Sequence, residues 1–273
     1  MAKSRAILSA SLGLGKVIMR VSNLVLACLA SLTALSAPRA AEVTCSFDCN
    51  QPLVHLVLKG EIRPGDFAKV QSLVPPNLEE IPNRMVWITS PGGDVYEAMK
   101  IGRWLRQHEF TVSAFKHCAS ACIFLLSAGV NRVVMPGAAI AIHRPYLLEL
   151  PQGENVQQAM RDLLRLSKAY FAEMNMPENL ADDMFSIEPA KSRKLSTREV
   201  SAYRLDQEDL VYQEQWQLEG ARRLGISRGE YLKRWRDYQD SGTAEACRRE
   251  IFTTENADIR SCMMNAFKRF GLW

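Results

Sequence analysis

A serine flanked by small residues is the feature of this chain best suited to chemistry. Ser120 lies in the segment Cys-Ala-Ser-Ala-Cys-Ile at residues 118–123, at the expected start of an apolar helix. A serine hydroxyl can attack a carbonyl carbon when a neighbouring base accepts its proton, and backbone N–H groups can stabilise the oxyanion that forms. The Ser-Pro-Gly-Gly turn at residues 90–93 could supply such N–H groups, and His143 could supply the base. Together the three segments predict a serine hydrolase site.

Of the four histidines, His143 is the best candidate for the general base. It follows the apolar run 138–142, so a buried strand would deliver it to the sheet edge that faces the nucleophile. His117 lies three positions before the expected helix start, and we expect its side chain to point elsewhere. His55 and His108 have structural explanations, the first within a strand and the second at the end of an exposed helix.

The oxyanion hole is predicted from two backbone N–H groups, those of Gly93 and Ala121. Gly93 belongs to a turn that joins an apolar strand to a helix capped by Asp94, and glycine lets a backbone approach a ligand closely. Ala121 would stand at a helix N-terminus, where unpaired N–H groups and the helix dipole favour a negative charge. An oxyanion formed at Ser120 would therefore meet two donors.

The elements that must position these residues follow from the hydrophobic pattern. The apolar run at 85–89 is bounded by turn residues, which is typical of a strand buried on both faces of a parallel sheet. Further strands are expected over 54–62, 110–115, 132–135 and 138–143, and helices over 66–74, 95–105, 120–128, 155–174, 178–184 and 197–203. This alternation predicts an α/β fold with a mostly parallel sheet, in which Gly93, Ser120 and His143 follow the carboxyl ends of strands.

The first 41 residues differ in character from the rest of the chain. Four cations precede an apolar stretch at residues 21–35, and small residues follow it, a pattern typical of a secretory signal peptide. An uncleaved membrane anchor is the alternative, since an uncharged run of about 17 residues is near the lower limit for a spanning helix. The protein is therefore expected to be periplasmic or secreted, with anchoring in the inner membrane as the second option.

Charge and motif spacing argue against nucleic acid and metal as partners. Five of the 34 basic residues and none of the 30 acidic residues lie in the first 41, so the rest of the chain has 29 basic and 30 acidic residues. That balance offers no phosphate-binding footprint. The Cys-x-x-x-Cys pairs have a loose spacing for zinc, and no histidine lies in a matching partner motif. We expect no metal and no cofactor.

The cysteines predict disulfides. Removal of the N-terminal segment would take Cys28 with it and leave six, an even number in an exported chain. These six are Cys45, Cys49, Cys118, Cys122, Cys247 and Cys262. The pair easiest to bridge is Cys247 with Cys262, in a polar tail with little core of its own, while spacing does not fix the other partners. Cys118 and Cys122 are expected to brace the nucleophile helix through disulfides to other segments.

Length and composition favour one large domain, or one domain with an appendage. The chain has 273 residues, of which 47% are hydrophobic, enough to bury a full core. Toward the C-terminus the sequence becomes polar and charged but carries Trp216 and Trp235, which indicates two or three more helices. We therefore expect a domain over residues 42–207 and a helical C-terminal extension over 208–273.

Several motifs resemble the proteolytic subunit of Clp protease and its relatives in the ClpP/crotonase superfamily, most closely an exported, Cys-containing ClpP-like branch. The similar segments are Ser-Pro-Gly-Gly at 90–93, Ala-Ser-Ala at 119–121, Ala-Gly at 128–129, Ile-Ala-Ile-His-Arg-Pro at 140–145 and Leu-Ser-x-x-Glu at 195–199. The resemblance covers roughly residues 50–207. It implies a spiral of β-β-α units, with Ser120 as nucleophile, His143 as base, and the Gly93 and Ala121 amides as oxyanion hole.

The family's catalytic aspartate has no counterpart in this chain. It would fall at about Ser192, within the stretch Glu-Pro-Ala-Lys-Ser-Arg-Lys at residues 188–194. Ser192 or Glu188 could orient the imidazole instead. The third member of the triad is therefore left open.

Other residues near this stretch have weaker claims to the role. Asp182 and Asp183 lie earlier in the chain, and we expect them to be solvated charges on a helix. A Ser-Lys arrangement that uses Lys191 is an alternative, but the match at His143 argues against it.

The resemblance implies an exported serine peptidase that cuts peptides or unfolded proteins by acyl transfer. Because the family's ATP-driven unfoldases work in the cytosol, an exported member would act without one. The helix at 155–174 stands where relatives carry their ring-pairing helix, which implies a homo-oligomer. Loss of the orienting acid can lower turnover in a serine protease by about 10⁴, so a catalytically impaired binding or scaffold protein is the alternative. An acyl-CoA enzyme of crotonase type is a third option that export argues against.

Overall fold

The computed structural model describes the chain except for its N-terminal segment and six internal gaps. The residues described are 41–46, 53–78, 81, 83–146, 155–243, 245–247 and 259–273. The predicted signal or anchor therefore lies outside them, apart from its last residue. Within the described ranges, no helix has the length and apolar character that crossing a membrane requires.

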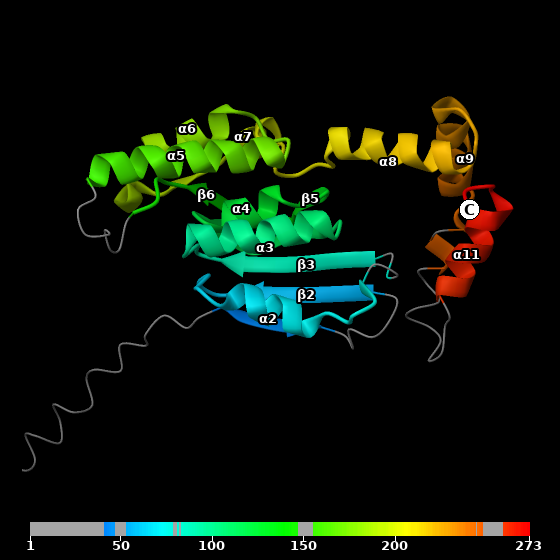
Figure 1. Ribbon diagram of the computed structural model, residues 1–273, viewed down its shortest axis with the longest axis horizontal. Coiled ribbons are helices and arrows are strands. Elements are labelled where there is room, and N and C mark those ends of the chain that lie inside the picture. Colours follow the sequence, from blue (N-terminus) through cyan, green and yellow to red (C-terminus); the bar gives the residue numbers. More distant parts are fainter. Residues whose placement is uncertain are drawn as a thin grey trace, which may run out of the picture. The chain divides into compact units, whose positions relative to one another are not determined.

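A seven-stranded, mostly parallel sheet forms the centre of the fold (Figure 1). Its strands are β1 (Glu42–Cys45), β2 (Leu53–Lys59), β3 (Asn83–Ser90), β4 (Thr111–Ala119), β5 (Asn131–Val134), β6 (Ala139–Ile142) and β7 (Arg193–Lys194). The order is β1-β2-β3-β4-β6-β7, and β5 pairs with β4 beside this path. Only the two outer pairs, β1 with β2 and β6 with β7, are antiparallel. The predicted α/β fold is confirmed.

Helices alternate with the strands as the apolar periodicity predicts. They are α2 (Asp66–Leu73), α3 (Val95–Gln107), α4 (Cys122–Ser127), α5 (Val156–Glu173), α6 (Asn179–Ser186) and α7 (Thr197–Ala202), with the short 3-10 helix η2 (Pro189–Lys191) before β7. Side chains cap the N-termini of α3 and α5. An Asp94 carboxylate oxygen accepts from the Glu97 N–H at 2.7 Å, and the Asn155 side-chain oxygen accepts from the Gln157 N–H at 2.8 Å. Both caps satisfy donors that a helix N-terminus leaves unpaired.

The structure corrects the predicted boundaries around the candidate nucleophile. Strand β4 runs on to Ala119, beyond the predicted end at residue 115, and α4 begins at Cys122 rather than at residue 120. Between them Ser120 has φ 55°, a left-handed conformation that can continue neither a strand nor a right-handed helix. Strands β1 and β7 were not predicted, because four and two residues are too few to show an alternating pattern.

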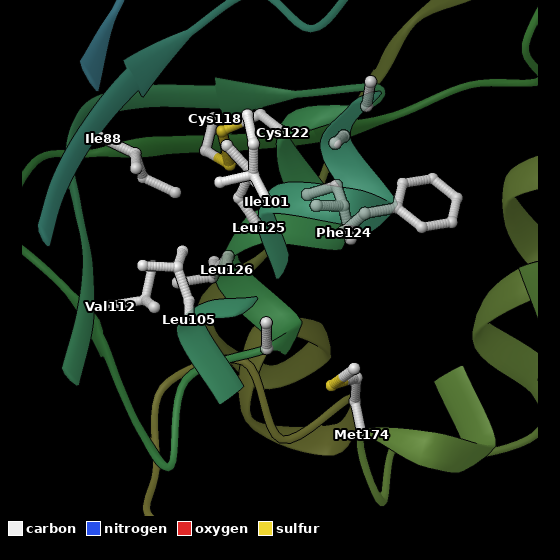
Figure 2. Packing of buried hydrophobic residues seen from close by; sticks show 14 of the residues in the cluster. Ile88, Ile101, Leu105, Val112, Cys118, Cys122, Phe124, Leu125, Leu126 and Met174 are labelled. Carbon is white, nitrogen blue, oxygen red and sulfur yellow. A yellow bond between two sulfur atoms is a disulfide. The ribbon is translucent and has the colours of Figure 1, made fainter. Parts of the chain in front are cut away.

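One hydrophobic core holds the sheet and its helices together. All six residues of α4 are buried, which explains why this helix is apolar all round. Its Phe124, Leu125 and Leu126 pack with Ile101 and Leu105 of α3 (Figure 2). Because α4 also contacts β3 and β4, the helix that follows Ser120 is fixed from several sides.

The C-terminal residues form helices around an aromatic cluster of their own. These are α8 (Leu210–Arg223), α9 (Arg228–Asp240) and α11 (Ile259–Arg269). Trp216 lies 5.1 Å from Trp235 between ring centroids, and Tyr238 packs on Phe267. A disulfide joins Cys247 to Cys262, as predicted. These side chains form an apolar cluster separate from the main core, and the division into a domain at 42–207 and an extension at 208–273 stays a prediction.

Candidate active site

Ser120 occupies a sharp turn between a buried strand and a buried helix. Its backbone is left-handed, with φ 55°, and the residue is only 8% exposed. The Ser120 N–H donates to the Ala141 carbonyl at 3.2 Å, which ties the turn to β6. A non-glycine residue in this conformation carries strain, and strain of this kind is concentrated at functional sites. In serine hydrolases a similar strand-turn-helix geometry presents the nucleophile.

The glycine turn after β3 packs directly against Ser120. A Cβ atom placed on Gly92 would lie 2.6 Å from the Ser120 Cβ and 2.8 Å from the Ala119 carbonyl oxygen. Ser90 shapes this turn, since its Oγ accepts from the Gly92 N–H at 3.1 Å and donates to the Gly92 carbonyl at 3.3 Å. Only glycine fits position 92, where φ is 111°.

Two backbone hydrogen bonds to Ile62 hold the turn around Gly93. The Ile62 N–H donates to the Gly92 carbonyl and the Asp94 N–H donates to the Ile62 carbonyl, both at 2.8 Å. Ile62 thus bonds to the residues on either side of Gly93. In such a parallel bridge the N–H and carbonyl of Gly93 itself point away from Ile62. The role of the Gly93 N–H in an oxyanion hole stays a prediction.

The second predicted donor, the Ala121 N–H, stands at the N-terminus of α4. The carbonyls of Ser120 and Ala121 accept from Ile123 and Phe124, so the first turn of the helix is closed. The N–H groups that precede this turn have no partner within the helix. A Cβ on Gly92 would lie 3.0 Å from the Ala121 nitrogen, so the glycine turn packs against the start of α4.

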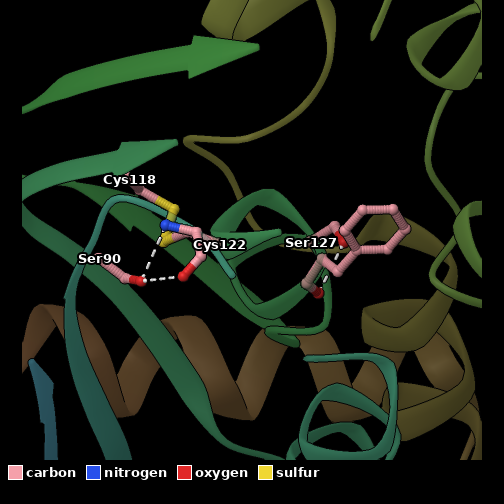
Figure 3. Close-up of a disulfide and its surroundings, with 6 residues drawn as sticks. Ser90, Cys118, Cys122 and Ser127 are labelled. Carbon is pink, nitrogen blue, oxygen red and sulfur yellow. Dashed lines mark hydrogen bonds between the residues drawn. A yellow bond between two sulfur atoms is a disulfide. The ribbon is translucent and has the colours of Figure 1, made fainter. Parts of the chain in front are cut away.

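A disulfide brackets the candidate nucleophile. Cys118 and Cys122 are bonded to each other, with their Cα atoms 5.2 Å apart. The expectation that they bond to other segments is therefore wrong. They come close because the chain reverses at Ser120, whereas a continuing strand would separate them by about 13 Å. Figure 3 shows the bridge beside Ser90, the residue that pairs with Cys118 across β3 and β4.

His143 follows β6 directly, two residues after the carbonyl that binds the Ser120 N–H. Its Nδ1 lies 2.9 Å from the Arg144 carbonyl oxygen. A carbonyl can only accept, so Nδ1 carries the proton and Nε2 is left as the acceptor. Among the described residues no hydrogen bond joins Ser120 to His143, although such catalytic bonds often tighten only when substrate binds.

No carboxylate among the described residues hydrogen-bonds to the His143 ring. The register of β6 with β7 pairs Ile142 with Arg193, so one further step would set Ser192 opposite His143, where the family's aspartate is expected. The nearby acids have other partners: Asp182 pairs with Lys168, Asp183 accepts from Tyr203, and Glu188 pairs with Lys191 at 3.0 Å. The ion pair of Lys191 also argues against a Ser-Lys mechanism.

Of the other histidines, His55 lies within a strand as expected, whereas His108, expected at the end of an exposed helix, is half-buried at the end of α3, most of whose residues are buried. His55 is 2% exposed, lies against Trp87, and has its pKa lowered because burial disfavours the charged ring. His117 is exposed on β4 and pairs in register with Ala139. Within the described ranges, no group of three or more histidine, cysteine or acidic side chains could hold a metal ion.

Sequence reasoning missed two parts of this arrangement. The first is the close packing of Gly92 against Ser120. The Gly-Gly pair in the sequence signals a turn, but it does not show that Gly92, and not Gly93, makes this contact. The acceptor for the His143 ring is a main-chain carbonyl, and a main-chain group leaves no signature in a sequence.

Comparison with known proteins finds a family match over the same region. Residues 73–195 match the family model of Clp protease. The match includes the glycine turn, the Ser120 turn, His143 and the segment that precedes β7. No curated protein matches the chain.

Proposed function

Because residues 73–195 match the family model of Clp protease, we propose that this protein is a serine peptidase of the ClpP/crotonase-like superfamily. Ser120 is the nucleophile, His143 is the general base, and the Gly93 and Ala121 N–H groups form the oxyanion hole. The observation that carries the proposal is the left-handed turn at Ser120, packed against Gly92 and tied to the strand that leads to His143.

Peptide hydrolysis would follow the acyl-transfer sequence. The Ser120 Oγ attacks the scissile carbonyl while Nε2 of His143 takes its proton, and the oxyanion that forms is met by the two N–H groups. The proton then passes from His143 to the leaving amine, which leaves an acyl group on Ser120. A water molecule, deprotonated by His143, releases the acid product and restores the serine.

The Arg144 carbonyl would take over part of the missing acid's task. By accepting from Nδ1 it fixes the ring tautomer in which Nε2 can receive the serine proton. A neutral carbonyl stabilises the imidazolium less than a carboxylate would, because a hydrogen bond to a charged partner is roughly twice as strong. We therefore expect slow turnover rather than none.

We further propose that the protein acts outside the cytosol on peptides or unfolded chains, without an ATP-driven partner. Support comes from the signal-like pattern of residues 1–41 and from two disulfides, Cys118–Cys122 and Cys247–Cys262. Disulfides form and persist in oxidising compartments and are rare in cytosolic proteins.

Labelling with a fluorophosphonate probe tests the active site. The purified full chain is expected to react at Ser120, Ser120→Ala to lose the reaction, and His143→Ala to slow it by about 10² to 10⁴, the usual contribution of a general base. Ser72→Ala and His117→Ala are matched controls, since both residues are exposed and lie outside the proposed site. Mass spectrometry of the labelled peptide gives the position.

Equal labelling of wild type and Ser120→Ala would exclude Ser120 as nucleophile. Wild-type protein that is folded but unreactive would reject the peptidase proposal as a whole.

A non-catalytic binding or scaffold protein is the second candidate. It is favoured by one observation, the carbonyl in place of a carboxylate at His143. This candidate expects Ser120→Ala to complement a deletion strain as well as wild type does. Failure of that variant to complement, at normal protein levels, would rule it out.

We also propose that the protein self-associates. ClpP-like proteins typically form oligomers, and α5 stands where relatives carry their ring-pairing helix. Several residues in the first three turns of this helix are exposed, including Val156 at 52%. Sedimentation velocity of the full chain should show a species larger than the 30.7 kDa monomer. Val156→Glu should shift it toward the monomer, and a monomer in both cases would contradict the proposal.

A further inference from the structure

The Cys118–Cys122 disulfide closes a loop around two groups whose positions matter most for the proposed reaction, the Ser120 side chain and the Ala121 N–H. The bridged segment contains Ser120 and the N–H group of Ala121, with one cysteine at the end of β4 and the other opening α4. The nucleophile and one oxyanion donor therefore share a covalently closed ring of five residues.

The ring restrains a conformation that the backbone does not favour on its own. Ser120 has φ 55°, which only glycine adopts freely. An extended segment of this length would place the Cα atoms of Cys118 and Cys122 about 13 Å apart. The disulfide holds them at 5.2 Å and so excludes the extended alternatives.

The bridge is also connected to the other half of the oxyanion hole. Cys118 pairs in register with Ser90, whose hydroxyl holds both the N–H and the carbonyl of Gly92. Figure 3 shows the disulfide and Ser90 side by side. A shift of the cystine would therefore disturb the glycine turn together with the Ser120 turn.

Both sulfur atoms belong to the core rather than to the surface. Cys118 and Cys122 are 0% exposed and lie near Ile101 and Leu125 in the main apolar cluster (Figure 2). Reductants reach such a bond only when the fold opens, so the bond is set during folding and does not act as a surface switch.

We propose that the Cys118–Cys122 disulfide is a positioning element of the active site, whose formation during folding makes Ser120 competent. The inference rests on the proposed peptidase function. In the step itself the two thiols form one S–S bond, and their two electrons and two protons reduce the disulfide of a thiol oxidant to a dithiol. The enzyme would be active when folded under oxidising conditions and poorly active when folded with these thiols reduced.

The test compares two double variants that each lose one disulfide. Cys118→Ala/Cys122→Ala is expected to slow fluorophosphonate labelling of the full chain by about 10- to 100-fold, since a misplacement of about 1 Å can cost 10² in rate. Cys247→Ala/Cys262→Ala is the matched control and should label at the wild-type rate. The control should lose more thermal stability, because its disulfide closes a longer loop.

A crystal structure of Cys118→Ala/Cys122→Ala gives a readout that does not depend on activity. The expected result is a Ser120 φ that leaves the left-handed region or a turn with several conformers. An unchanged φ near 55°, or labelling at the wild-type rate, overturns the proposal.

Two further provisions keep the test decisive. If the double alanine variant fails to fold, Cys118→Val/Cys122→Ala refills the strand position with a β-branched residue and is subjected to the same readouts. If the wild type is not labelled, the peptidase proposal fails on its own, and the conformation of Ser120 alone decides the role of the disulfide.

Discussion

Replacement of Gly92 by alanine should slow the labelling of Ser120 by at least about 10³-fold while leaving a folded protein. The added Cβ would lie 2.6 Å from the Ser120 Cβ, 2.8 Å from the Ala119 carbonyl oxygen and 3.0 Å from the Ala121 nitrogen. All three atoms belong to the nucleophile turn, and two of them are backbone atoms that cannot rotate away. The turn must therefore move as a unit.

The expected loss of rate follows from the size of this movement. Contacts below 3.0 Å require a displacement of several tenths of an ångström at the least, and a misplacement of about 1 Å can cost 10² in rate. The same shift would carry the Ala121 N–H away from the oxyanion, and one lost donor costs a further 10² to 10³. We expect a decrease of at least about 10³ in the labelling rate constant and, from overpacking, a loss of about 1–3 kcal/mol in the free energy of unfolding.

Gly65→Ala is the matched control for Gly92→Ala. Gly65 has φ 95°, close to the 111° of Gly92, but a Cβ there would meet nothing within 4 Å. The control should lose about 1–2 kcal/mol from backbone strain alone and should label normally. If Gly92→Ala labels as fast as Gly65→Ala, the glycine turn does not define the site.

The sequence is sufficient to predict where the candidate residues lie in the fold, as far as they lie at the ends of strands. Gly93 and His143 come after apolar runs, and parallel pairing of β3, β4 and β6 brings the ends of these strands, with Ser120 at the end of β4, to one edge. Such runs are visible because burial on both faces demands continuous apolar residues. The helix cap at Asp94 is predicted for a similar reason, since capping is local in sequence.

What the sequence does not reveal depends on backbone geometry that no pattern encodes. The pairing of Cys118 with Cys122 requires the chain reversal at Ser120, and a plain strand or helix at this position would be equally compatible with the residue types. Likewise the partner of His143 is a carbonyl, which every residue has. The disulfide pairing and the partner of His143 are therefore visible only in the three-dimensional structure.

Asp209 is a third residue that the pattern does not single out, and its loss should destabilise the protein more than any other single change considered. Its carboxylate is 2% exposed and accepts from Arg106 at 2.6 Å, from Arg132 at 3.0 Å and from Asn175 at 3.0 Å. These partners come from segments as far as 103 residues away. Asp209 also caps α8 through the N–H groups of Val211 and Tyr212.

Arg132 makes the loss of Asp209 costly. This side chain is 1% exposed, and burial lowers its pKa to about 10, which leaves it charged at neutral pH. Its remaining partners are the carbonyls of Ser127, Met174 and Arg204, which accept hydrogen bonds but do not neutralise the charge. Removing one partner of a buried pair typically costs about 3–5 kcal/mol. Asp209→Ala should lose that amount in urea unfolding followed by circular dichroism.

Two controls separate the charge from the helix cap. Ser227→Ala removes only the cap of α9, where the Ser227 Oγ accepts from the Glu230 N–H, and should cost about 1 kcal/mol. Asp209→Asn keeps an oxygen for the cap but not the charge, so it should resemble Asp209→Ala more than Ser227→Ala. A loss near 1 kcal/mol for Asp209→Asn would show that the cap, and not neutralisation of Arg132, is what Asp209 contributes.

The pH dependence of stability gives an independent check on Asp209. Burial raises its pKa, but hydrogen bonds from the Tyr212 N–H, Asn175 and Arg106 outweigh burial and hold the pKa below the ordinary value. A carboxyl group whose folded pKa is lowered contributes stability that is present above its unfolded pKa of about 3.9 and is lost as the pH falls through the folded pKa. Wild-type stability should therefore fall more steeply below about pH 4 than that of Asp209→Asn, which cannot take up this proton. If the free energy of unfolding of the two proteins fell equally with pH, protonation of the Asp209 carboxylate would not be the cause of the acid destabilisation.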